Sequence, residues 1–509
     1  MRVSLIALPA LSGMRYSLLA ATMTVIAGCA VHPTPFTDSE SARAAQAGRT
    51  ELVGQQDPVT GPITLDEAMA RAILHNLDNR VKIMEEALAQ NQLDLANFDM
   101  LPKLTTAAGY TGRDHLLASR SVGLATGSTT VPPSYSSDKA DHTYDAAFSW
   151  NLLDFGVSYY EAREQADRVL VVGERRRRVV QLMMQQVREA YWEAAGAQRL
   201  HDRIEPLLQQ ARSALDDSRQ AQHEQLRAPL GSLNYQRELL VIMDQLEIVR
   251  GHLNAAKPRL ASLMNLEPGK EYTLAPPETF GPPEFQMPIE RMEEIALQRR
   301  PDLIEANYNE RIGVNEAHKA LAKLLPGIEL ELGTHYDSNS FLSFNKWEDA
   351  GVRVSWNLLN LLNAKSIRRT ADAQLALEHT QRLALSMAVL TQVHVARSDL
   401  EAKRHEFELT RQLQDIDRQI LEHTHNAAQA SAEGKLEEIR AATSAMISEL
   451  RLYESYGDLQ SAYGNLLATL GLDPVPDTVK GRDLASLEQA IAQERQHWAE
   501  LGESDRTNR

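Results

Sequence analysis

The sequence has one cysteine, few aromatic residues and, beyond residue 30, no long apolar run. Because Cys29 is the only cysteine, the chain cannot form an internal disulfide. Aromatic residues make up 6% of the 509 residues, and no apolar stretch after residue 30 approaches the roughly 18 residues of a membrane-spanning helix. Any role in a membrane must therefore use something other than a bundle of apolar helices.

Positive charge and catalytic motifs are also scarce. The chain carries 53 Lys and Arg against 69 Asp and Glu, a net charge of −16, which disfavours a nucleic-acid partner. No Gly-x-Ser-x-Gly, Walker A, Gly-x-Gly-x-x-Gly or His-Glu-x-x-His pattern occurs. His423 and His425 lie two residues apart, so a helix would point them in different directions. We expect a protein that is not an enzyme and binds no metal.

The N-terminus has the order of an export signal. Arg2 and Arg15 precede an apolar stretch over residues 18–26, which ends in Ile-Ala-Gly-Cys at Cys29. This ending resembles the lipobox of bacterial lipoproteins, in which the thiol is acylated and becomes the new N-terminus; a stray or buried thiol is the alternative. We predict a signal peptide over residues 1–28, and a covalent lipid on Cys29 is the only cofactor that we expect.

The residue after the cysteine bears on the destination. Ala30 stands in place of the aspartate that holds some bacterial lipoproteins at the inner membrane, which favours the outer membrane. Residues 29–60 are interpreted as a lipid-anchored tether. Met14 is an alternative start, and the sequence leaves that choice open.

Most of the remaining chain is an internal duplication. Ser-Trp-Asn-Leu-Leu occurs at residues 149–153 and again at 355–359, and this offset of 206 residues aligns the two copies without a gap from each Trp to Leu266 and Leu472. Upstream the offset is 224, because the first copy holds 18 extra residues in a Gly/Ser/Thr/Pro-rich segment. That segment is predicted to be a long exposed loop.

Each copy has the same succession of patterns. Thr64 is an N-cap candidate with Glu67 three residues later, and a helical pattern runs from there to about Met100. Two stretches of period 2 follow, with apolar residues on one face and polar residues on the other, as at residues 328–333. A half-buried strand over a soluble core is one interpretation, but two strands bury little by themselves.

Long helical patterns follow the strands. In the first copy no loop signal interrupts residues 159–225 except Pro206, which should kink the helix. About 70 residues at 1.5 Å each span roughly 100 Å, and a return helix follows over residues 230–266. Since four strands are too few for a closed barrel, closure requires several copies. Three copies would give twelve strands, apolar outside and polar within, beside a tube of helices.

We therefore predict a mainly α-helical fold with a small β-barrel part, built from a duplicated unit of helix, strand, strand, long helix and return helix. The first repeat spans residues 61–270, a linker 271–288 and the second repeat 289–474. A tail follows over residues 475–509, where Leu484, Leu487 and Ile491 predict a short helix.

The lipobox, the duplicated order of elements and the repeated Ser-Trp-Asn-Leu-Leu resemble the TolC-type outer membrane efflux proteins, in their lipid-anchored branch. The resemblance covers nearly all of residues 60–474. It implies a homotrimer with a twelve-stranded barrel in the outer membrane and a periplasmic α-helical barrel. It also implies a periplasmic adaptor and an inner-membrane transporter as partners. Trp150 and Trp356 would then lie in the aromatic belts that meet lipid headgroups.

Members of that family carry a turn between the long and return helices where the tube closes. On that motif this chain has Gly231 in the first copy where an Asp is usual. In the second copy it has Glu437 and Glu438, with Arg440 where TolC has a second Asp; Ser431 takes the usual Gly position. Glu437, Glu438 and Arg440 are therefore candidate gate residues, and a solvated helix end is the alternative.

Three functions remain open. The first is the outer membrane exit duct of a tripartite efflux system, passive toward small molecules. The second is the outer membrane conduit of one-step (type I) protein secretion. The third is a non-channel periplasmic coiled-coil scaffold lipoprotein, against which the alternating strands count. The run Arg175 to Arg178 would point all round a helix, so we expect a solvated or inter-protomer face there in preference to a binding site.

Overall fold

The computed structural model describes residues 33–53, 56–122, 124–129, 132–224, 229–267, 269–277, 280–281, 283, 285–428, 434–473 and 483–504. The chain divides into two compact units, Met1–Gln56 and Asp57–Arg509. In the first unit, α2 (Asp38–Val53) is an exposed helix within the segment interpreted as a tether. Cys29 and the predicted signal peptide lie outside the described residues.

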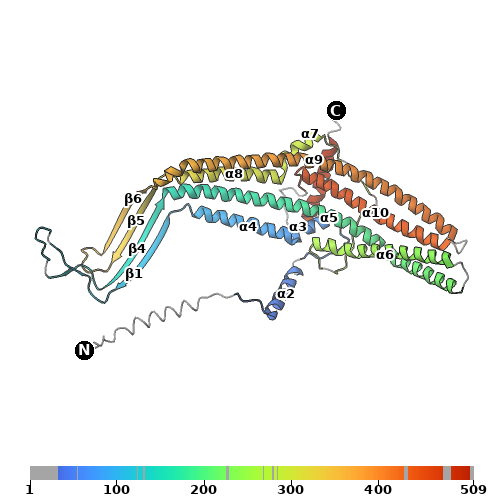
Figure 1. Cartoon of the computed structure of the whole chain (residues 1–509), viewed down its shortest axis with the longest axis horizontal. Helices are drawn as coiled ribbons and strands as arrows, with labels where there is room; N and C mark the ends of the chain where they lie inside the picture. The colour runs from blue at the N-terminus through green and yellow to red at the C-terminus, as the bar shows by residue number, and fades with distance from the viewer. Residues whose placement is uncertain are drawn as a thin grey trace, which may run out of the picture. The chain divides into compact units, whose positions relative to one another are not determined.

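The second unit contains the same order of elements twice (Figure 1). The first copy runs α3 (Leu65–His75), α4 (Leu77–Phe98), β1 (Lys103–Gly112), β4 (Ala140–Asn151), α5 (Leu152–His223) and α6 (Pro229–Leu263). The second runs α7 (Ile289–Arg299), α8 (Pro301–Ala322), β5 (Gly327–Asp337), β6 (Lys346–Ser355), α9 (Leu359–Ala428) and α10 (Gly434–Thr469). The predicted duplication is confirmed. The short helix predicted in the tail is also confirmed, as α11 (Leu484–Ser504).

The helix before the first strand is divided, although its sequence predicts one helix from Thr64 to about Met100. Thr64 is the N-cap of α3 as expected, because its hydroxyl accepts a hydrogen bond from the Glu67 amide at 3.0 Å. At Asn76, however, the backbone is extended (φ −62°, ψ 128°) and the side chain accepts a hydrogen bond from the Asp78 amide at 3.0 Å. An asparagine that caps the next helix ends the first one.

The second copy divides at the corresponding position, 224 residues later. Arg300 is extended (φ −64°, ψ 126°) between α7 and α8, and Pro301 is the first residue of α8. A proline ring disfavours helical backbone in the residue before it, and it is well tolerated at the start of a helix. The prediction of one continuous helix is therefore wrong in both copies. The first copy breaks at the capping residue Asn76, and the second breaks before Pro301.

Four strands form one antiparallel sheet in the order β1-β4-β5-β6. Residues opposite one another in such a sheet share a face. Leu104 pairs with Phe148, and Phe148 pairs with Leu332, whereas the neighbouring pair of Ser149 and Glu331 lies on the other face. The predicted separation of apolar and polar faces is thus confirmed. Within the described chain, β1 and β6 each pair on one side only, so the sheet has two open edges.

The connection between β1 and β4 is exposed over its described residues up to Ser136, as predicted, but it is not without structure. In it β2 (Ala118–Ser119) and β3 (Ser134–Tyr135) pair as a small antiparallel ladder. The Tyr135 ring meets the Phe341 ring edge to face, with centroids 5.3 Å apart. The Asn339 side chain donates a hydrogen bond to the Ser136 carbonyl at 3.1 Å. These contacts fold the insertion onto the loop between β5 and β6.

The long helices pack around one hydrophobic core. Helix α5 has 72 residues and α9 has 70, so each is about 100 Å long. Helix α5 packs against α4, α6, α8 and α10. Leu200 and Leu208 of α5, Leu246 of α6 and Leu466 of α10 are fully buried in a single cluster. Pro206 lies inside α5, which continues through it as one helix.

Candidate functional site

The repeated motif forms the junction between a strand and a long helix. Asn151 is the N-cap of α5: its Oδ1 accepts hydrogen bonds from the amides of Leu153 at 2.9 Å and Asp154 at 3.3 Å. In the second copy Asn357 Oδ1 accepts a hydrogen bond from the Leu359 amide at 3.1 Å. This role was not predicted from the sequence, although an asparagine directly before a helical pattern is a known start signal.

The two tryptophans of the motif lie at the same end of the sheet as these caps. Trp150 is half-buried and meets Phe155 edge to face, with ring centroids 5.7 Å apart. Trp356 is 49% exposed, and its Nε1 donates a hydrogen bond to the Leu324 carbonyl at 3.0 Å. Both rings are held at the strand-to-helix junction, and their place at a membrane interface stays a prediction.

The polar face of the sheet is rich in carboxylates. His335 lies between two of them, with Nδ1 2.7 Å from Asp145 Oδ1 and Nε2 3.3 Å from Asp349 Oδ2, and its ring stacks on Trp347 at 5.3 Å. Next to this group, Arg353 approaches Glu329 at 3.5 Å and Glu331 at 3.6 Å. Asp145, Asp349, Glu329 and Glu331 thus gather around His335 and Arg353, which makes this part of the face strongly polar.

The candidate gate residues come together at the end of the helices away from the sheet (Figure 1). Arg440 pairs with Glu437 at 2.6 Å and with Glu238 of α6, while Glu438 lies 2.6 Å from His425 Nδ1 of α9. Burial opposes the charge of Arg440, but the hydrogen bonds that it donates to Glu238 and Glu437 outweigh this effect and raise its pKa.

These contacts engage the candidate gate residues within a single chain. The carboxylate of Glu437 is paired within its own chain, and Arg440 joins the return helices of the two repeats. In the first copy Gly231 is an exposed residue of α6. Ser431 and the turn around it lie outside the described residues. A gating role of these residues stays a prediction.

The run of arginines on α5 is engaged within the chain. Arg175 pairs with Glu305 of α8 at 2.7 Å, and Arg176 pairs with Glu86 of α4 at 2.8 Å. Arg177 pairs with Asp473 at 2.6 Å, while Arg178 is exposed. The four side chains do point all round the helix. We expected these arginines to face solvent or a neighbouring chain. Only Arg178 is free to do so, because the other three form ion pairs with residues of the same chain.

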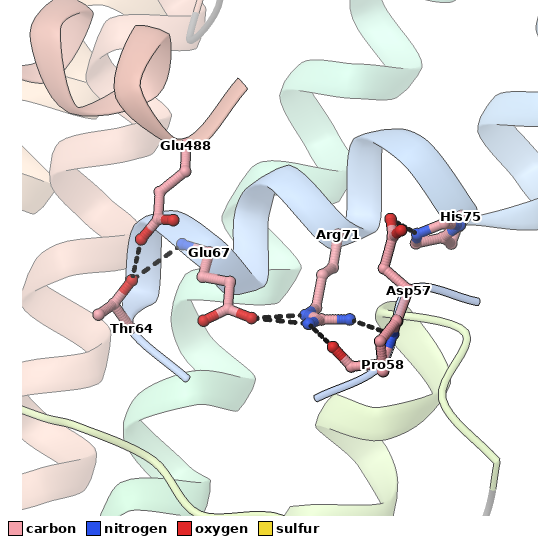
Figure 2. A network of polar contacts seen from close by, with 7 residues as sticks. All are labelled: Asp57, Pro58, Thr64, Glu67, Arg71, His75 and Glu488. Carbon is pink, nitrogen blue, oxygen red and sulfur yellow. Dashed lines mark hydrogen bonds and ion pairs between the residues drawn. The ribbon is translucent and has the colours of Figure 1, made fainter. Parts of the chain in front are cut away.

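A network around α3 joins segments that are far apart in the sequence, as Figure 2 shows. Arg71, 1% exposed, donates hydrogen bonds to Glu67 at 2.8 Å and to the carbonyls of Asp57 at 2.9 Å and Pro58 at 3.2 Å. Thr64 donates to Glu488 of α11 at 2.9 Å. The network fastens the C-terminal helix and the start of this unit to α3. Nothing in the sequence pattern indicated these partners.

Across the described residues, no helix is both long and apolar enough to cross a membrane. No group of three or more His, Cys, Asp or Glu side chains in the described part of the chain is arranged to hold a metal ion.

Comparison with solved structures identifies the fold. The outer membrane channel CmeC from Campylobacter jejuni superposes with a TM-score of 0.62 at 11% identity, covering 91% of this chain and 97% of that one. The outer membrane protein VceC from Vibrio cholerae gives 0.58 at 16% identity, with 80% and 96% covered. CusC, whose structures concern transmembrane channel formation, gives 0.59 at 16% identity, with 82% and 95% covered.

These similarities extend over nearly the whole length of each channel, so the chain has the fold of outer membrane channel proteins. No known protein family matches the sequence, and no curated protein matches it. The fold expected from the resemblance to TolC-type proteins is confirmed by the structural comparison. Because the sequence identities are only 11 to 17%, the comparison supports a shared fold and does not by itself assign a function.

Proposed function

We propose that this chain is an outer membrane channel of the TolC type, the exit duct of a tripartite efflux system. The observation that carries the proposal is the open four-stranded sheet at one end of two helices of 72 and 70 residues. One chain cannot close that sheet. Three chains, each pairing β6 with β1 of the next, make a barrel of twelve strands.

The exposed apolar residues of the helices support the same oligomer. Helices α4 and α9 each carry apolar side chains at helical spacing that are more than half exposed. These are Met84, Leu88, Leu95 and Phe98 on α4, and Leu383, Met387, Val395 and Leu409 on α9. Contiguous exposed apolar surface marks an interaction site. In the homotrimer these stripes face neighbouring chains and complete the periplasmic helical barrel.

The two faces of the sheet suit a barrel wall. The apolar face, with Leu104, Phe148 and Leu332, would face lipid, and the carboxylate-rich face would line water. Trp150 and Trp356 would lie at the headgroups, and a lipid on Cys29 would anchor the chain to the outer membrane. The duct is passive and does no covalent chemistry, so a periplasmic adaptor and an inner-membrane transporter supply selection and energy.

A conduit for one-step protein secretion has the same fold and differs in its partner, so co-purification of the inner-membrane transporter distinguishes the two channels. A non-channel scaffold lipoprotein is disfavoured by the two-faced sheet. The function is tested by inserting the purified full-length protein into planar bilayers. We expect stepwise, cation-preferring conductance, and a correctly assembled protein without conductance would contradict both channel functions.

A further inference from the structure

A small cavity lies between α5, α11 and the C-terminal end of α10, away from the sheet. Its volume is about 30 Å³, which leaves space for about one or two water-sized particles. Its polar lining comprises Gln181, Gln185 and Arg188 of α5, Asp473, and Arg495 of α11. Ile491 and Trp498 bring the apolar side of α11 to the same cavity.

Arg188 brings a positive charge to this cavity, and among the described residues it forms no ion pair. The residue is 6% exposed, and its Nε is buried without a hydrogen-bond acceptor in the described part of the chain. Burial lowers the pKa of the Arg188 guanidinium to about 10, so the group is still cationic at neutral pH. A buried charge that lacks both a partner and solvent is strongly unfavourable.

The carboxylates nearby are already engaged. Asp66 of α3 pairs with Arg495 at 2.9 Å. Asp473 accepts hydrogen bonds from Arg177 at 2.6 Å and from Gln181 at 2.7 Å.

Glu488 of α11 does not compensate Arg188 either. It accepts the hydroxyl hydrogen bond of Thr64 at 2.9 Å, and the charged groups that act on Arg188 are Arg495 and Asp66. Asp66 is therefore shared by the guanidinium groups of Arg495 and Arg188, and Arg188 makes no hydrogen-bonded ion pair of its own in the described part of the chain.

We propose that this cavity binds one small monovalent anion, such as chloride, next to the guanidinium of Arg188. Gln185, which also lines the cavity, offers an amide donor to the same ion. The anion neutralises the buried charge and holds α11 against α5 and α10. The site is separate from the conduit, so it stands or falls independently of the proposed function.

The test is thermal unfolding of the purified full-length protein in detergent, with chloride exchanged for gluconate at constant ionic strength. Gluconate is too large for the cavity. We expect the wild-type Tm to be higher in chloride by about 2 °C or more, because an ion that binds only the folded state stabilises it. Arg188→Met should have the same Tm in both salts. The matched control Arg178→Met removes an exposed arginine of the same helix and should keep the chloride effect.

A wild-type Tm that is indifferent to chloride, or an equal chloride effect in Arg188→Met, would overturn the proposal. If Arg188→Met does not fold, wild-type crystals grown in bromide decide the matter. An anomalous peak in the cavity beside Arg188 supports the site. A bromide structure with only water in the cavity, or with peaks only at the protein surface, overturns it.

Discussion

Asn151 and Asn357 explain why one short motif recurs in two distant places. Each asparagine accepts hydrogen bonds from backbone amides where a strand gives way to a helix of about 70 residues. The amides of a first helical turn have no partners within the helix, so a side-chain acceptor there has a direct energetic effect. Asn151 directly precedes α5 and accepts from two amides, whereas Asn357 stands two residues before α9 and accepts from one, so the two junctions use the same residue with slightly different geometry.

Asn151→Ala should lower the free energy of unfolding by about 1 kcal/mol, the usual effect of losing an N-cap. Asn151→Asp keeps an acceptor oxygen and should be close to wild type. The control Asn91→Ala replaces an exposed asparagine of α4, where alanine is the better helix former. Denaturant unfolding measures all three, and equal stabilities of the two alanine variants would contradict the capping role.

Arg71 is the most buried charged residue of the network in Figure 2, with three acceptors around it. Arg71→Met should destabilise the protein by about 3 kcal/mol, because it leaves Glu67 without its buried partner. Arg178→Met removes an exposed charge and should change stability by less than about 0.5 kcal/mol. The measurement is urea unfolding, and a small loss in Arg71→Met would show that the network is dispensable.

Glu454 predicts a pH dependence of stability. Burial is the main cause that raises the pKa of its carboxyl above the ordinary value of 4.5. Between pH 4.5 and the higher pKa of the folded state, the folded protein binds more protons at this group than the unfolded chain does. The free energy of unfolding therefore falls as the pH rises through this range. Glu454→Gln should therefore be more stable than wild type near neutral pH, with the difference shrinking below the ordinary pKa. Thermal unfolding over a pH series, with exposed Glu422→Gln as control, checks this.

At the scale of elements, α6 and α10 are joined at their ends by a single arginine. Arg440 pairs with Glu437 one turn earlier on its own helix and with Glu238, which is 202 residues away in the sequence. Because Glu238 belongs to the other repeat, the link could not be predicted from the tip motif alone. It ties the two halves of one chain at the place where the duct would close.

Arg440→Ala should loosen the tip and leave two carboxylates unpaired. We expect a larger single-channel conductance and a stronger preference for cations in planar bilayers. Arg418→Ala, which removes an exposed arginine of α9 paired only locally with Asp415, serves as control and should conduct like wild type. If Arg440→Ala and the control give identical currents, the tip contact has no part in gating.

Elements that depend on local sequence could be predicted, and those that depend on distant contacts could not. The strands were predicted from apolar residues at every second position, such as Ile328, Leu330 and Leu332, and the long helices from apolar residues at a period of 3.6. The break at Asn76 was not predicted because the helical pattern continues on both sides of it, so the N-cap role of this asparagine was overlooked. The β2–β3 ladder was missed because it forms on the loop beyond β5, more than 200 residues away.

On the scale of the whole molecule, the duplication could be predicted from the repeated sequence. The trimer was inferred because one chain supplies too few strands to close a barrel. The sheet order β1-β4-β5-β6 places one strand pair of each repeat side by side and leaves an open edge at each end. Of the candidate site, the junction tryptophans and the tip residues were found by motif. Their partners were not, because ion pairs such as Arg440 with Glu238 depend on tertiary packing.

In the proposed trimeric channel, each chain supplies a third of the barrel wall, four of its twelve strands. Native mass spectrometry of the protein extracted from the outer membrane in mild detergent tests this most directly. We expect a complex of three identical chains. A monomer or dimer as the largest stable species, in a preparation that retains its folded α-helical content, would contradict it.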